Sequence, residues 1–253
     1  MHGLAGVLAI GGDPQASIQA FQLAEEALDR SVREFGEGHE CTIESRNLMG
    51  EALWIVDLDE ALAQHEIAHR ASLQAFGPND LLTLGSLNNI VVVLIKQGRY
   101  AEALPLALED LTVSRAEFGD DHFHTLYAIQ TLGRLHGRML QYEDAIPLLE
   151  EAVNRRRTLF GHSHPATLHA CRNLSFYLHR QGGYSRCEEV LSESIKASSK
   201  LGTRHGLHQY FLQAMVELQN AWHDGDPNGE WNLDVRDQCF ERIIDNAPRP
   251  IHP

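Results

Sequence analysis

Residues 160–168 have the sequence Phe-Gly-His-Ser-His-Pro-Ala-Thr-Leu, and parts of this stretch recur along the chain at a fixed spacing. An aromatic residue or leucine followed by glycine begins at Phe35, Phe76, Phe118, Phe160 and Leu201. These positions are 41, 42, 42 and 41 residues apart. A threonine stands seven residues after each phenylalanine, at Thr42, Thr83, Thr125 and Thr167. Self-similarity at a period of this length indicates an array of repeated supersecondary units.

Each unit is predicted to contain two helices. In the unit that starts at Thr83, the apolar residues follow helical spacing until Gln97-Gly98. A second helix is expected from about Tyr100 to Phe118, where Gly119 ends it, because glycine tolerates the backbone of a helix terminus. The threonine is expected to cap the first helix, since its side-chain oxygen can accept a hydrogen bond from an orphan backbone N–H. A small residue, such as Ala103, lets the two helices approach closely.

The period predicts an all-α solenoid of antiparallel helix pairs. We expect the pairs at about 3–34, 42–76, 83–118, 125–160 and 167–201, with 207–246 as a C-terminal cap. The cap is divided by the turn-rich stretch Asp224–Glu230 into helices at about 207–223 and 232–246. A single pair cannot bury its apolar face alone, which is why such units occur as arrays. No low-complexity linker divides the chain, so residues 1–253 are expected to form one domain.

Composition excludes several classes of protein. The net charge of -14 argues against a nucleic-acid partner and against docking on an anionic membrane surface. No apolar stretch approaches the length of a membrane span, and the first twelve residues make a poor signal peptide. The four cysteines are far apart, which favours reduced thiols in a cytoplasmic protein.

Three motifs carry a resemblance to a known family. They are Phe160-Gly-His-Ser-His-Pro-Ala-Thr-Leu168, Leu87-Asn-Asn-Ile90 and Gln97-Gly-Arg-Tyr-Ala-Glu-Ala103. Together they resemble the tetratricopeptide repeat in its longer variety of about 42 residues, found in kinesin light chains and in many bacterial and fungal sensor proteins. The resemblance covers roughly residues 15 to 220 and implies a right-handed superhelix whose first helices line a concave groove. It is weak for function, because one solenoid serves many partners. His39 departs from the motif, since no proline follows it, and the 42–76 unit is one residue short.

Carboxamide side chains fall at the inward-facing positions that the resemblance implies. They are Asn47, Asn88, Asn89, Gln130 and Asn173. Each carries both a hydrogen-bond donor and an acceptor, so a row of them could bind an extended peptide backbone. The alternative interpretation is that some of them tie neighbouring helices together.

Basic and aromatic residues complete the predicted peptide-binding set. The basic members are Arg134, Arg138, His169, Arg172 and Arg180, and the others are Tyr127, Phe176, Tyr210 and Gln213. Arginine presents a rigid fork that suits carboxylates, which predicts an acidic peptide segment or a C-terminal carboxylate as the ligand. The alternative is that these arginines are solvated or paired with acidic residues. Arg155, Arg156 and Arg157 are expected to form such salt bridges on an outer face.

No motif of catalysis, metal binding or cofactor binding is present in the sequence. His122 and His164 fall at the inter-repeat histidine of the family, and the isolated cysteines do not form a zinc site. No catalytic residue, metal or cofactor is therefore predicted, and the favoured function is an adaptor that binds a peptide of a partner protein. Two alternatives stay open. The groove could serve as the pocket of an atypical enzyme or small-molecule-binding protein, or the chain could self-associate as a scaffold, for example as a homodimer.

Overall fold

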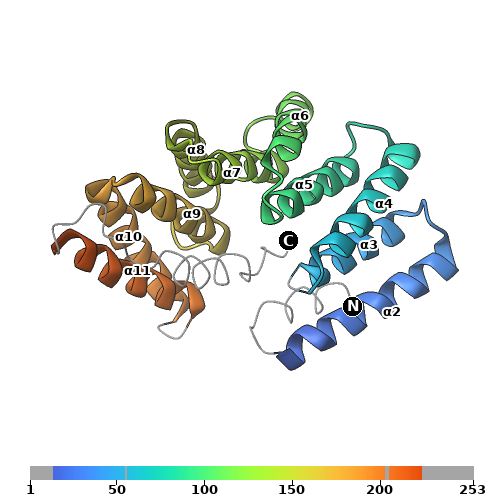
Figure 1. The fold of residues 1–253 in the computed structure, drawn as a ribbon, viewed down its shortest axis with the longest axis horizontal. Helices are drawn as coiled ribbons and strands as arrows, with labels where there is room; N and C mark the ends of the chain where they lie inside the picture. Colours follow the sequence, from blue (N-terminus) through green and yellow to red (C-terminus); the bar gives the residue numbers. More distant parts are fainter. Residues whose placement is uncertain (1–13, 55, 203–204, 224–253) are drawn as a thin grey trace. The chain divides into compact units, whose positions relative to one another are not determined.

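The computed structural model describes residues 14–54, 56–202 and 205–223, and the chain is helical throughout these ranges (Figure 1). The helices are α2 (Pro14–Phe35), α3 (Glu40–Leu53), α4 (Leu58–Phe76), α5 (Leu81–Lys96), α6 (Tyr100–Phe118), α7 (Phe123–Arg138), α8 (Tyr142–Phe160), α9 (Pro165–Gln181), α10 (Tyr184–Ser198), the short 3-10 helix η1 (Ser199–Leu201) and α11 (Gly206–His223). The prediction of an all-α helical repeat solenoid is confirmed. Within the described ranges, no helix is both long enough and apolar enough to cross a membrane.

The pairs follow the predicted order, with α3, α5, α7 and α9 as first helices and α4, α6, α8 and α10 as second helices. Second helices α6 and α8 begin at Tyr100 and Tyr142 and end before a glycine, as the sequence predicts. Gly119 and Gly161 adopt φ values of 81° and 85°, a backbone region that is strained for residues with a Cβ atom. The glycines therefore end these helices for a conformational reason. The expected first pair lies partly, and the expected helix at 232–246 wholly, outside the described residues.

The prediction that threonine caps each first helix is wrong. The side chain of His39, Asp80 or His164 accepts the hydrogen bond from the backbone N–H two residues later, and the helix begins at the next residue. The threonines lie inside the first turn and are fully buried. Two of them bind the preceding helix instead: the hydroxyl of Thr125 donates to the Ser114 carbonyl and that of Thr167 to the Arg156 carbonyl, at 3.1 and 3.2 Å.

The capping histidines are held by the recurring phenylalanine four residues earlier. Phe35 stacks on His39 with ring centroids 4.5 Å apart, and Phe160 stacks on His164 at 4.9 Å. Phe118 and His122 make the same contact at 4.7 Å. The ring contact fixes the imidazole, so that its Nδ1 atom can accept from the helix. The Phe-Gly element thus ends one helix and positions the cap of the next.

The described residues fall into two compact units, residues 14–138 and 139–223. In the first unit, helices α2 to α7 pack in succession, and Ala61 and Ala103 are fully buried where paired helices meet. In the second unit, α8 to α11 surround an apolar cluster that includes Leu149, Leu174 and Phe211. Whether the full chain folds as one domain stays a prediction.

Candidate functional site

Asn47 belongs to a chain of hydrogen bonds that joins α3, α4 and α5. Its Nδ2 atom donates to the Ser86 hydroxyl at 2.8 Å, and its Oδ1 atom lies 3.0 Å from Nδ1 of the fully buried His65. The indole Nε1–H of Trp54 donates to His65 Nε2 at 3.3 Å. Because the indole nitrogen is only a donor, Nε2 of His65 carries no proton and Nδ1 donates to Asn47. Asn47 therefore ties helices together.

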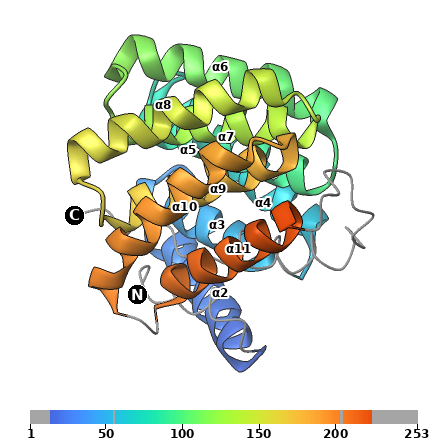
Figure 2. The same cartoon turned by 90° about the vertical axis from the view of Figure 1, so that its left-hand side faces the viewer.

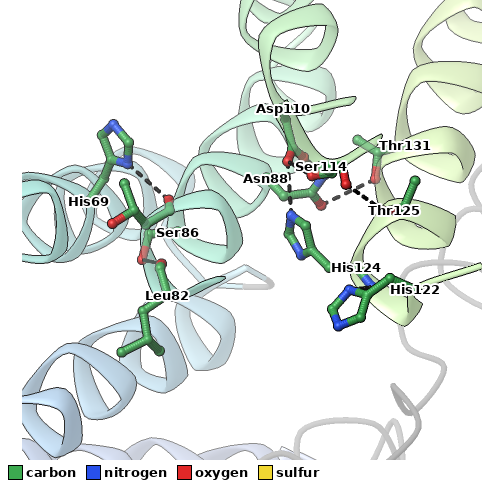
Figure 3. Close-up of polar contacts among 11 residues, drawn as sticks. His69, Leu82, Ser86, Asn88, Asp110, Ser114, His122, His124, Thr125 and Thr131 are labelled. Atoms are coloured by element: carbon green, nitrogen blue, oxygen red, sulfur yellow. Dashed lines mark hydrogen bonds and ion pairs between the residues drawn. The ribbon is translucent and has the colours of Figure 1, made fainter. Parts of the chain in front are cut away.

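Asn88 lies in a second buried network, shown in Figure 3, which joins α5, α6 and α7. Its Nδ2 atom donates to Asp110 Oδ2 at 2.7 Å, and its Oδ1 atom accepts from the Thr131 hydroxyl at 3.2 Å. Asp110 is fully buried and also accepts from His124 Nε2 at 2.9 Å and from the Ser114 hydroxyl at 3.1 Å. With three donors around one carboxylate, this network satisfies a buried charge that would otherwise cost several kcal/mol.

The carboxamide row is thus divided by the structure. For Asn47 and Asn88 the geometry supports the helix-tying interpretation, because these side chains bond to neighbouring helices. Asn89 and Asn173 are also buried, with exposed fractions of 6% and 3%. Gln130 on α7 keeps partial exposure. The physical reason is that an amide beside buried hydroxyl and carboxylate groups must bond to them.

Helix α7 carries the accessible part of the predicted set. Between His124 and Arg138 the partly exposed residues are Tyr127, Gln130, Arg134, His136 and Arg138, and the remainder are buried. Four of these five, at positions 127, 130, 134 and 138, follow the spacing of one helix face. We call these four residues the α7 stripe. It combines one aromatic, one carboxamide and two arginine side chains.

In the second unit, several predicted residues are buried instead of accessible. His169, Arg172 and Tyr210 have exposed fractions of 8%, 4% and 5%. The guanidinium of Arg172 lies 5.9 Å from the ring centre of Tyr210, which places these side chains of α9 and α11 together. Burial lowers the pKa of His169 well below its ordinary value, and the positive charges of Arg172 and Arg156 lower it further. His169 is therefore a neutral imidazole in a positively charged surrounding. Burial raises the pKa of Tyr210, so its phenol keeps its proton.

Phe176 and Arg180 are the predicted residues of α9 that stay accessible. Both are partly exposed, and the Arg180 guanidinium lies 6.0 Å from the Phe176 ring centre. Such a cation over an aromatic face is attracted by the ring quadrupole. Gln213 on α11 is exposed and donates to Glu217 at 3.0 Å.

The prediction for the three arginines of α8 is partly wrong. Arg155 and Arg157 do form ion pairs, with Glu151 at 2.9 Å and Glu193 at 2.7 Å. Arg156, however, is only 5% exposed and donates to the Ala166 carbonyl at 3.3 Å, so it does not lie on an outer face. A sequence signal for this existed: the repeat places buried serines at the equivalent positions Ser31, Ser72, Ser114 and Ser198. An arginine at a repeat position that otherwise holds a buried serine indicates a side chain that the interior must accommodate.

Asp110 and His124 are the main residues that the sequence analysis missed. The repeat equivalents of Asp110 are Ala68 and Ala152, so a lone aspartate in an alanine column was the available signal. Neither residue carries a recognisable motif. Their hydrogen bond depends on the packing of α6 against α7, which no local sequence pattern indicates.

Two findings on the described residues concern metal ions and thiols. No group of three or more His, Cys, Asp or Glu side chains in these ranges is placed to hold a metal ion. Burial raises the pKa of the Cys171 thiol, which disfavours the thiolate that a nucleophile would need. Cys41, Cys171 and Cys187 are free thiols.

Comparisons with known proteins agree with the repeat geometry. The family model described as tetratricopeptide repeat matches residues 82–158 and 129–200. No curated protein sequence matches the chain.

Three solved structures are similar in fold. The structure described as "Podosopora anserina putative kinesin light chain nearly identical TPR-like repeats" aligns at 18% identity with a TM-score of 0.58, covering 81% of this chain and 95% of that chain. BtubC (BKLC) from P. vanneervenii aligns at 14% identity with a TM-score of 0.69, covering 94% and 96%. PilF from Pseudomonas aeruginosa aligns at 16% identity with a TM-score of 0.53, covering 94% and 93%. The repeat period, the paired helices and the family-model match show that residues 82–200 consist of tetratricopeptide repeats, a repeat class that generally binds protein partners, and the three solved structures share this fold.

Proposed function

We propose that this protein is an adaptor whose first helices bind an acidic, extended peptide segment of a partner protein. The observation that carries the proposal is the α7 stripe, four partly exposed residues along one face of a first helix that is mostly buried between His124 and Arg138. Solenoid repeats use the surface of such helices as extended binding faces. In a chain with a net charge of -14, a face with two arginines is a selective place for an anionic segment.

The spacing within the α7 stripe fits a particular ligand geometry. Arg134 and Arg138 are one helical turn apart, so their Cβ atoms are separated by about 6 Å. Alternate side chains of an extended peptide project to the same side about 6.6 Å apart. Acidic residues at alternate peptide positions would therefore meet successive arginines. Gln130 can donate to or accept from the peptide backbone, and Tyr127 offers an aromatic surface.

The second unit offers a contact surface of its own, because the Arg180 guanidinium lies 6.0 Å from the Phe176 ring centre on α9. Arg172 is buried, so a substitution there would alter folding as well as any contact with a ligand. We therefore leave Arg172 out of the proposed binding residues. The free thiols of Cys171 and Cys187 suit a reducing, cytoplasmic location.

The test is a binding measurement with a panel of extended peptides, acidic and charge-matched basic, on the wild type and on Arg134→Glu/Arg138→Glu. The matched control is Arg70→Glu/Arg99→Glu, which makes the same charge change at two exposed arginines of the same unit, Arg70 on α4 and Arg99 directly before α6. We expect acidic peptides to bind the wild type and the control, with affinity that falls as salt is raised. The α7 variant should lose this binding while it keeps its helical circular dichroism.

Two results would overturn the proposal. Equal loss in the control variant would show that only net charge matters. Absence of binding to every acidic peptide by the folded wild type would remove the acidic-peptide function itself.

A further inference from the structure

Helix α11 repeats the start of the preceding first helix, which fixes its alignment. His205 Nδ1 accepts from the Leu207 backbone N–H at 3.3 Å, as His164 Nδ1 accepts from Ala166 N–H at 3.2 Å. The offset between the two histidines is 41 residues. It makes Leu212 equivalent to Cys171, and Val216 equivalent to Ser175.

In complete pairs, this face of the first helix packs against the second helix of the same pair. The thiol of Cys187 on α10 donates to the Ser175 carbonyl on α9 at 3.3 Å, and both Cys171 and Ser175 are 2% exposed. In α3 the position equivalent to Val216 is Gly50, and the imidazole of His65 on α4 packs directly against it. The equivalent residues of α5, Leu87 and Val91, are also buried.

In α11 the same face is open. Leu212 is 39% exposed and Val216 is 50% exposed, and they lie one turn apart. The opposite face is closed, because Phe211 and Leu218 are almost fully buried in the apolar cluster of the second unit. Figure 2 shows α11 beside α9 and α10 at the end of the described repeats. The exposed face is thus the place that a second helix occupies in the pairs α3–α4, α5–α6 and α9–α10.

The sequence after α11 offers a segment of the right kind. Thirty residues follow His223, and they begin with the turn-rich stretch Asp224–Glu230. Apolar residues then recur at helical spacing, at Val235, Cys239, Phe240, Ile243 and Ile244. The span 232–246 has 15 residues, the same length as α10.

We propose that residues 232–246 dock in cis on the Leu212–Val216 face of α11 as the second helix of a sixth pair. A segment tethered by a short connection is present at an effective concentration in the millimolar range. A second copy of the chain would have to compete with that concentration. Docking closes the apolar end of the array, which would otherwise invite stacking with another molecule.

The test is a mutant cycle in the full-length protein. Val216→Asp alters the open face, Phe240→Asp alters the docking segment, and a double variant carries both. Gln213→Asp is the matched control, because Gln213 is exposed and directly follows Leu212. Urea unfolding midpoints and molar mass by light scattering over a tenfold concentration range are measured for each.

In-cis docking predicts that Val216→Asp and Phe240→Asp each move the midpoint to lower urea by clearly more than Gln213→Asp, which removes only the exposed hydrogen bond of Gln213 to Glu217. The double variant should fall no further than the more damaged single variant, because both changes break one contact. The wild type should keep the mass of one chain at all concentrations.

The proposal is overturned if Val216→Asp unfolds like the control, or if the two single effects add. It is also overturned if the wild type forms a dimer that Val216→Asp dissociates, since the occupant would then be a second copy. Val216 is half exposed in the structure, so the substitution does not by itself prevent folding.

Discussion

The α6–α7 and α8–α9 junctions occupy the same place in consecutive repeats, yet their interiors differ. At α6–α7, buried Asp110 accepts from His124, Asn88 and Ser114. At α8–α9, the equivalents of Asp110 and His124 are Ala152 and Ala166, both buried. There the arginine Arg156 replaces Ser114 and donates to the Ala166 carbonyl. One repeat backbone therefore accepts either a charged network or two alanines with a buried arginine.

This difference shows that equivalent positions in consecutive repeats can hold side chains of very different polarity and charge. The Phe-Gly turns and capping residues keep each junction in place, so the interior can vary as long as its polar groups are satisfied. The charged junction depends on several partners at once. It should therefore be the more sensitive of the two to single substitutions.

The largest expected effect is that of Asp110→Ala. The change removes the acceptor of His124, Asn88 and Ser114 and leaves their donors buried. We expect the free energy of unfolding to fall by about 3–5 kcal/mol, which urea denaturation would measure.

The double variant Asp110→Ala/His124→Ala provides the control, because it copies the alanine pair of α8–α9. If the two junctions are interchangeable, it should recover part of the stability lost in Asp110→Ala. If the free energy of unfolding of the double variant falls by as much as in the two single variants combined, then the alanine pair of α8–α9 cannot replace the polar network of α6–α7.

The next effect concerns the other polar network of the first unit. A Cβ atom at Gly50 would lie 2.5 Å from Nε2 of the buried His65 ring. Gly50→Ala should therefore displace His65 from Trp54 and Asn47 and lower the free energy of unfolding by about 1–3 kcal/mol. Denaturation monitored by circular dichroism gives the value.

Gly85→Ala is the matched control on α5. A Cβ atom there meets nothing within 4 Å, so alanine should stabilise the helix by about 0.5–1 kcal/mol. Equal effects of the two substitutions would contradict the role assigned to the His65 ring.

The two networks also show what the sequence could and could not reveal. Helix ends at Tyr100 and Phe118 were predictable because glycine and the repeat spacing act locally. The role of Asn88 was not, since it depends on Asp110, which lies 22 residues away on another helix. The threonine caps failed for a related reason: a histidine or aspartate stood nearby, and only the structure shows which side chain reaches the backbone.

The exposure of the residues proposed to bind a peptide was predictable in part. The α7 stripe has the partial exposure expected of a binding face, and its ligand role stays a prediction. Arg172 was expected on an accessible surface but is buried beside Tyr210, because α11 covers that part of α9. Helix periodicity gives the face of a residue on its own helix and not what the next repeat places over it.

In the second unit, the buried imidazole of His169 should make the free energy of unfolding depend on pH. The pKa of His169 is lowered in the folded state, so the unfolded state takes up the proton first as the pH falls. The contribution is present above the ordinary histidine pKa of about 6.5 and is lost below it, by up to about 1.4 kcal/mol per pH unit. Urea denaturation between pH 7 and pH 5 should show this slope in the wild type and a smaller one in His169→Gln. Identical slopes would contradict the neutral, buried state of His169.

The smallest effect is expected at Cys187, which occupies the column of fully buried Ala61, Ala103 and Ala145. Cys187→Ala restores the residue of the other repeats, so the free energy of unfolding should change by only about 1 kcal/mol. Burial raises the pKa of the Cys187 thiol to about 12, so at pH 8 about one molecule in ten thousand carries the reactive thiolate. Alkylation followed by peptide mass spectrometry should therefore label partly exposed Cys41 well before Cys187. Equal labelling rates in the folded protein would mean that the α9–α10 contact opens readily.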